Sequence, residues 1–175
     1  MTIDHIAVVG AGAWGTALAL AAHRAGRTVT LWGRNVADMA ASRENVAHLP
    51  GVKLPASLRI TDQIGDVLAA DAILLATPAQ TVREVAAHLE AIAEDTPVVL
   101  CAKGLERGTA KRMTEVLAEA LPPAAPAVLS GPSFAVDVAR GLPTAVTIAA
   151  AEPKLAMALC QALGSSSFRP YAETD

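Results

Sequence analysis

GAGAWG at residues 10–15 is the stretch that decides the fold of this chain. An apolar run at 6–9 leads into these glycines, an alanine- and leucine-rich segment at 16–25 leaves them, and a second apolar run occupies 28–32. Glycines spaced GxGxxG also occur in ordinary turns. A strand, turn, helix and strand within about 30 residues are more specific, because they form the βαβ unit that binds a dinucleotide. We therefore predict a dinucleotide-binding turn here.

Each glycine of this turn has a separate physical task. Gly10 permits the tight turn, Gly12 lets the backbone approach a pyrophosphate, and Gly15 lets the helix lie close to the strand. The start of the helix offers free N–H groups and a positive dipole end to phosphate groups. The three glycines are therefore candidate cofactor-binding residues.

Composition excludes several classes of function. The 175 residues suit one domain with a substantial core, in which 53% hydrophobic but only 3% aromatic residues make alanine, valine and leucine the main filling. A net charge of −3 gives no broad attraction for nucleic acid or for an anionic membrane surface. We expect no nucleic-acid partner.

Two further features favour a cytoplasmic protein that does not insert into a membrane. Residues 6–22 carry no charge, but glycines interrupt them and no basic segment precedes them, so a buried strand and helix explain them better than a membrane span or a signal peptide. Cys101 and Cys160 lie in apolar segments without a Cys or His at ligand spacing. We interpret both as reduced core residues and expect no metal site.

Strands and helices alternate along the chain, which predicts a Rossmann-type, doubly wound α/β fold with a mainly parallel sheet. The last two strands lie beyond a normal first nucleotide-binding half and are expected to extend the sheet. The predicted strands are 5–9, 28–32, 58–61, 71–76, 97–101, 127–130, 143–149 and 167–170. The predicted helices are 14–25, 36–45, 79–94, 109–121, 133–140 and 153–163.

The end of the second strand bears on the choice between NAD and NADP. An acidic residue there would bond the ribose 2′-hydroxyl and repel a 2′-phosphate, yet no acid occurs before Asp38. Arg34 stands at this position instead, and its guanidinium can bind a 2′-phosphate in a bidentate manner. A solvated loop arginine is the competing interpretation.

Three later strands end in further candidate residues at the ligand-binding edge of the sheet. Pro78 gives the chain a fixed exit after strand 71–76 and is a candidate cofactor contact. Lys103 directly follows strand 97–101, where it can meet an anion or a polarised carbonyl, or simply be solvated. The turn at 130–135 leads from a strand into a helix, with Pro132 expected in the helix's first turn, and it either binds an anion or only caps the helix.

Taken together, the chain resembles the N-terminal domain of the bacterial NAD(P)-dependent glycerol-3-phosphate dehydrogenases, from residue 5 to about 170. Many dehydrogenases share GxGxxG, whereas the combination of AKGLE and SGPSFA is specific to this family. The matching stretches are GAGAWGTALA (10–19), LWGRN (31–35), LPGVKLP (49–55), ATPAQ (76–80), AKGLE (102–106), SGPSFA (130–135) and GLPTAV (141–146).

The resemblance implies interconversion of dihydroxyacetone phosphate and sn-glycerol 3-phosphate with NAD(P)H, which supplies the backbone for glycerophospholipid synthesis. A cation near the ketone oxygen would stabilise the developing alkoxide during hydride transfer. The matching positions imply cofactor contacts at Ala13, Trp14, Arg34, Lys103 and Ala135, and substrate contacts at Lys103, Gly131 and Ser133.

The resemblance also implies a second part that this sequence does not contain. In the family, a mostly helical C-terminal domain carries the general acid/base lysine and the groups that hold the substrate phosphate. We therefore expect residues 1–175 to be the cofactor-binding domain, with no catalytic proton-transfer residue and little turnover alone. Whether the full-length protein is a homodimer is left open.

Two other functions share part of the pattern. Another reductase of the 6-phosphogluconate dehydrogenase-like group, such as a 3-hydroxyacid dehydrogenase or a ketopantoate reductase, would have the glycine motif but not AKGLE together with SGPSFA. A non-catalytic nucleotide-sensing domain would need the glycine motif, but neither Lys103 nor a second anion-binding turn.

Overall fold

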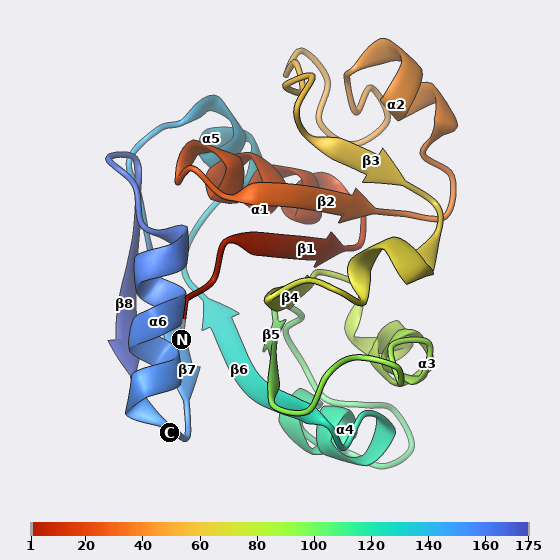
Figure 1. Cartoon of the computed structure of the whole chain (residues 1–175), viewed down its shortest axis with the longest axis vertical. Helices are drawn as coiled ribbons and strands as arrows, with labels where there is room; N and C mark the ends of the chain where they lie inside the picture. The colour runs from red at the N-terminus through yellow and green to blue at the C-terminus, as the bar shows by residue number, and fades with distance from the viewer. Residues whose placement is uncertain (1, 175) are drawn as a thin grey trace.

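A computed structural model describes residues 2–174, which form a sheet of eight strands (Figure 1). The strands follow one another along the sheet in the order β3-β2-β1-β4-β5-β6-β7-β8. Their bounds are β1 (His5–Val9), β2 (Thr28–Trp32), β3 (Arg59–Thr61), β4 (Ala72–Leu75), β5 (Thr96–Leu100), β6 (Ala124–Ser130), β7 (Thr144–Ala150) and β8 (Phe168–Glu173).

The direction of the strands confirms the doubly wound fold. All pairs from β3 through β6 are parallel, β7 is antiparallel to β6, and β8 is parallel to β7. The carboxyl ends of the six parallel strands therefore meet at one edge of the sheet. The strand order reverses between β1 and β4, and such a reversal opens a crevice that binds ligands in α/β sheets.

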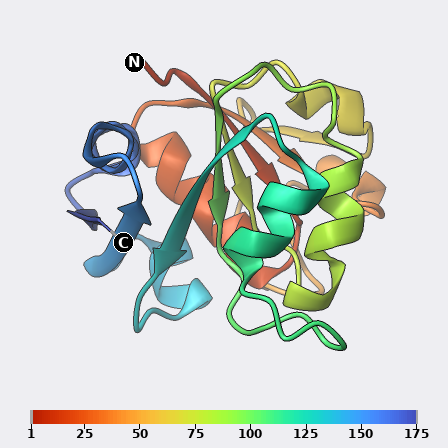
Figure 2. The same cartoon turned by 90° about the horizontal axis from the view of Figure 1, so that it is seen from below.

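Helices cover both faces of the sheet, with α3 and α4 on one face and α1 and α6 on the other (Figure 2). No helix within residues 2–174 has the length and apolar character needed to cross a bilayer. The helices are α1 (Ala13–Arg24), α2 (Ala37–Ser42), α3 (Val82–Ala87), α4 (Met113–Ala120), α5 (Ala135–Arg140) and α6 (Pro153–Leu163), with short 3₁₀ turns η1 (Ile64–Val67) and η2 (Ala79–Thr81).

The central strands read as uninterrupted apolar runs because both of their faces are buried. Ile6 and Val8 point into the core cluster shared with α1, whereas Ala7 and Val9 point into the cluster shared with α3 and α4. This alternation follows from the two-residue period of a strand. Helix α1 is buried almost all round, since it lies between the sheet and α5.

Three predicted helices are shorter in the structure. The helix predicted at 36–45 ends at Ser42 because Arg43 adopts a left-handed backbone (φ 53°), with its Nη2 donating to Leu58 O at 2.6 Å. The helix predicted at 79–94 consists of η2 and α3 and is regular only to Ala87. Beyond it the chain continues in turns that still bury Leu89 and Ile92 against the core.

The other shortened helices begin later than predicted. The helix predicted at 109–121 starts at Met113, since residues 103–112 form a loop with positive φ at Gly108 and Ala110. The helix predicted at 133–140 starts at Ala135 with Phe134 as its N-cap. Pro132 therefore lies in the preceding turn and not in the helix's first turn, as the sequence had suggested.

The glycine turn brings the start of α1 against the ends of β1 and β4. Gly10 has φ +117°, and a Cβ there would lie 2.6 Å from Ala76 O. A Cβ on Gly15 would lie 1.8 Å from Gly10 O and 3.3 Å from the Ala76 side chain. The two glycines are therefore required by close approach of backbone to backbone.

Gly15→Ala is expected to lower the free energy of unfolding by about 3 kcal/mol, at the upper end of typical overpacking costs. The loss outweighs the roughly 1 kcal/mol that alanine gains over glycine inside a helix. Urea denaturation measures it. Gly12→Ala is the matched control, because a Cβ on Gly12 meets nothing within 4 Å and its stability should stay within about 0.5 kcal/mol of the parent. Equal losses in the two variants would contradict the packing argument.

Candidate functional site

A cleft of about 1050 Å³ opens at the carboxyl edge of the sheet, where the strand order reverses. Its walls come from the glycine turn, the end of β2, the segment around α2, the exit of β4 and the outer face of α3. Among the residues predicted to bind the cofactor, those that line it are Gly10, Gly12, Ala13, Trp14, Arg34 and Pro78.

The first turn of α1 directs unsatisfied N–H groups toward the cleft. The backbone N–H of Thr16 donates to Gly12 O at 3.0 Å and closes the first turn of the helix, so the preceding N–H groups of Ala13, Trp14 and Gly15 have no acceptor inside the helix. The first turn carries no acidic residue to offset the positive helix end. Because Gly12 is open to the cleft, an anionic group can approach these N–H groups closely.

The end of β2 passes directly over this turn. Gly33 is buried, and a Cβ there would lie 2.6 Å from the Ala11 side chain. Arg34 follows at the cleft wall with its side chain exposed. Within residues 2–174 its guanidinium makes no hydrogen bond or ion pair, so the charge is available to a ligand.

Asn45 is a structural residue of this site that the sequence did not reveal. Its side chain is 3% exposed, and its Nδ2 donates to Ala11 O at 3.0 Å and to Thr16 Oγ1 at 2.8 Å. Its Oδ1 accepts from the backbone N–H of His48 at 3.2 Å. These bonds fix the segment after α2 as a wall of the cleft. An asparagine placed just before the breaker-rich stretch 49–55 was the available signal, but its partners are some 30 residues away.

The exit of β4 forms the facing wall. Pro78 is exposed at the cleft with extended backbone (φ −57°, ψ 145°) and precedes η2, where Thr81 Oγ1 donates to its carbonyl at 2.9 Å. Cys101, after β5, also lines the cleft. Burial raises the pKa of its thiol to about 12, so this sulfur stays protonated and unreactive at neutral pH.

The remaining predicted residues lie farther along the same edge, after β5 and β6. Lys103 Nζ donates to Gly131 O at 3.2 Å, which joins the turns that follow these two strands. Ser133 Oγ lies 3.5 Å from Ala145 O, at the start of β7. Ala135 begins α5 and packs against the core cluster shared with α1. None of the four residues lines the cleft itself, and neither does Gly15 beneath the turn.

Gly131 owes its position to the antiparallel strand β7. A Cβ on Gly131 would lie 3.1 Å from Ala145 O and from the Val146 Cα, so the turn after β6 packs tightly on that strand. In the part of the chain that the structure describes, no group of three or more His, Cys, Asp or Glu side chains is arranged to hold a metal ion.

Comparison with known proteins identifies the relatives of this chain. A family model described as the N-terminus of NAD-dependent glycerol-3-phosphate dehydrogenase matches residues 5–156. The glycerol-3-phosphate dehydrogenase [NAD(P)+] of Afipia carboxidovorans is 58% identical over 178 residues, which cover 99% of this chain and 54% of the relative. The enzyme of the same name from Bradyrhizobium diazoefficiens is 58% identical over 179 residues, covering 100% of this chain and 55% of the relative.

Solved structures lead to the same family. The crystal structure of glycerol-3-phosphate dehydrogenase from Coxiella burnetii superposes with a TM-score of 0.91 at 35% identity, covering 98% of this chain and 54% of that one. This chain spans about half the length of the curated relatives it matches. With the glycine turn, the cleft and the match over residues 5–156, the chain belongs to the N-terminal domain family of the NAD-dependent glycerol-3-phosphate dehydrogenases.

Proposed function

We propose that the protein carrying this chain reduces dihydroxyacetone phosphate to sn-glycerol 3-phosphate with NADPH or NADH, reversibly. The observation that carries the proposal is the bond between Lys103 Nζ and Gly131 O at 3.2 Å. It brings an ammonium group and a strand-to-helix turn together at the edge that also bears the dinucleotide cleft, in a chain of this family.

The cleft fits a nicotinamide dinucleotide, which supplies the hydride when bound. Its volume of about 1050 Å³ is ample for such a ligand. The N–H groups of Ala13 and Trp14 would bind the pyrophosphate at the positive end of α1, and open Gly12 would let it approach. Arg34 would lie at the adenosine end and bind a 2′-phosphate, and Pro78 would contact the cofactor from the facing wall.

The chain's own contribution to the chemistry is electrostatic. Hydride addition to the ketone carbon leaves negative charge on its oxygen, and the Lys103 ammonium would stabilise that charge while also contacting the cofactor. Gly131 and Ser133 would bind the substrate beside it, and Ala135 would contact the cofactor from the start of α5. The proton that completes the alcohol would come from a lysine in a helical domain beyond Asp175, as in the relatives' longer chains.

The proposed reaction sets the biological context. Its product is the phosphorylated glycerol backbone of glycerophospholipids, so the protein would serve lipid biosynthesis. The free thiols of Cys101 and Cys160 suit the reducing cytoplasm. A homodimer of the full-length protein is part of the proposal, and sedimentation of the purified protein tests it.

Arg34→Asp is expected to weaken binding of NADPH more than binding of NADH. Loss of a charge-assisted contact to the 2′-phosphate corresponds to about 1.5–3 kcal/mol, or roughly a tenfold to hundredfold change in the ratio of the two dissociation constants. Titration of nucleotide fluorescence measures both constants. Arg59→Asp, on the exposed edge strand β3, is the control and should leave the ratio unchanged. Equal losses for the two nucleotides would remove Arg34 from the 2′-phosphate role.

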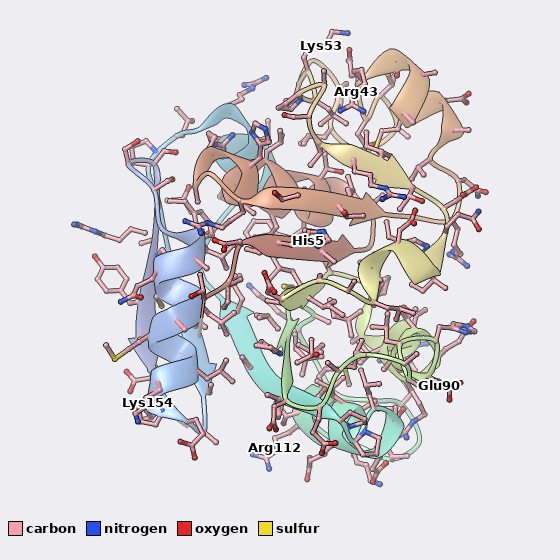
Figure 3. The ribbon with its side chains drawn as sticks, in the orientation of Figure 1. His5, Arg43, Lys53, Glu90, Arg112 and Lys154 are labelled. Carbon is pink, nitrogen blue, oxygen red and sulfur yellow. The ribbon has the colours of Figure 1, made fainter. Side chains whose placement is uncertain are left out.

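The activity itself is tested by nucleotide oxidation at 340 nm with dihydroxyacetone phosphate, using the full-length protein. We expect turnover by the parent and a decrease in kcat of about 10² to 10³ in Lys103→Met, the range for loss of one group that stabilises a developing oxyanion. Lys154→Met on α6 is the matched control, since Lys154 lies on the far side of the sheet from the turn after β5 (Figure 3). A Lys103→Met variant as active as the parent would contradict the assigned role.

Parallel assays separate the competing functions. Preferred turnover of a 3-hydroxyacid or of ketopantoate would place the protein with other reductases of this fold. Nucleotide binding without turnover of any of these substrates, and without an effect of substrate phosphates, would indicate a nucleotide sensor.

A further inference from the structure

The loop that carries Lys103 is held by side chains from the wall of the cofactor cleft. It runs over residues 102–112 without regular secondary structure, from the end of β5 to Arg112 before α4, which Figure 3 labels. Three positive φ angles shape it, at Gly104 (120°), Gly108 (83°) and Ala110 (55°). Such a loop has many alternative conformations, so bonds from outside must select one.

Gln80 supplies the first of these bonds. Its Nε2 donates to Leu105 O at 2.9 Å, and its Oε1 accepts from the backbone N–H of Arg107 at 2.9 Å. One side-chain amide thus grips the loop backbone on both sides of Glu106, two residues after Lys103.

Arg83 supplies the second. Its Nε donates to Glu106 Oε1 at 2.7 Å and its Nη2 to Glu106 Oε2 at 2.9 Å, a bidentate pair. The Arg83 guanidinium and the Thr109 hydroxyl lower the pKa of Glu106 to about 2, so this carboxylate stays charged throughout the neutral range. Nη2 of Arg83 also donates to Glu119 on α4 at 2.9 Å.

Both gripping residues come from the short helical segment that lines the cleft. Thr81, Glu84 and Val85 face the cleft, whereas Gln80 and Arg83 lie on a neighbouring face and hold the loop. This division follows the helical period, since residues three and four apart share a face. A dinucleotide in the cleft and the loop of Lys103 therefore rest on two sides of one rigid element.

We propose that Gln80 and the Arg83–Glu106 pair are positioning residues that fix Lys103 relative to the cofactor cleft. The role of Lys103 in this inference rests on the proposed function. Gln80 and Arg83 do not touch the reacting atoms; they act by holding the loop so that Lys103 reaches Gly131 O and the substrate beside it.

Gln80→Ala and Arg83→Met in the full-length protein test the inference by kinetics. Each should lower kcat/KM for dihydroxyacetone phosphate at least about tenfold, since displacement of a reacting group by about 1 Å can cost on the order of 100-fold. Nucleotide affinity should change less than about twofold. In a Lys103→Met background neither substitution should lower the rate further, because their effect passes through Lys103.

Arg59→Met is the matched control, because it removes the same side chain from an exposed arginine–carboxylate pair, with Asp66 at 2.7 Å, on the remote strand β3. It should leave kcat/KM unchanged. Losses in Gln80→Ala and Arg83→Met that add to that of Lys103→Met would overturn the inference, as would unchanged kinetics in both variants.

A spectroscopic measurement keeps the inference testable if the proposed reaction is wrong. Lysines carrying ¹³C-methyl labels give one NMR signal each, and Lys103→Arg assigns the signal of Lys103. We expect this signal to shift in Gln80→Ala and Arg83→Met but not in Arg59→Met. An unmoved Lys103 signal in both variants contradicts the inference, whereas failure of the parent to reduce dihydroxyacetone phosphate contradicts only the proposed function.

Discussion

The first turn of α1 lies against the ends of β1 and β4, and the rest of the site depends on that contact. It exists because Gly10 and Gly15 present no side chain, where a Cβ would lie 2.6 Å from Ala76 O and 1.8 Å from Gly10 O, respectively. The same approach directs the free N–H groups of the helix into the crevice at the reversal of strand order. Asn45 then bonds Ala11 O and adds a wall to the cleft that this turn begins.

The parallel sheet extends this site from one strand to the next. Because β1, β4, β5 and β6 all end at one edge, their turns bring the glycine motif, Pro78, Lys103 and Gly131 into one row. The antiparallel strand β7 supports the end of the row by packing against Gly131. Cofactor and substrate functions thus occupy adjacent strand ends, with the loop of Lys103 between them.

Sequence alone predicted the features that depend on local pattern. The strands are recognisable because strands buried on both faces are continuous apolar runs, and the glycine turn because its geometry requires glycine at fixed spacing. The ends of the helices were less accessible. Arg43 ends α2 through a bond to Leu58, and residues 103–112 are held by Gln80 and Arg83, so partners far along the chain decide both. Asn45 was missed for the same reason.

The central claim is that backbone N–H groups at the glycine turn bind the dinucleotide, with Gly12 leaving room for its pyrophosphate. The most direct measurement is the NADPH dissociation constant of Gly12→Ala beside that of the parent, with folding monitored by urea denaturation. Because a Cβ on Gly12 meets no protein atom within 4 Å, the account predicts an intact fold and binding at least about tenfold weaker. A folded Gly12→Ala variant that binds NADPH as tightly as the parent would contradict it.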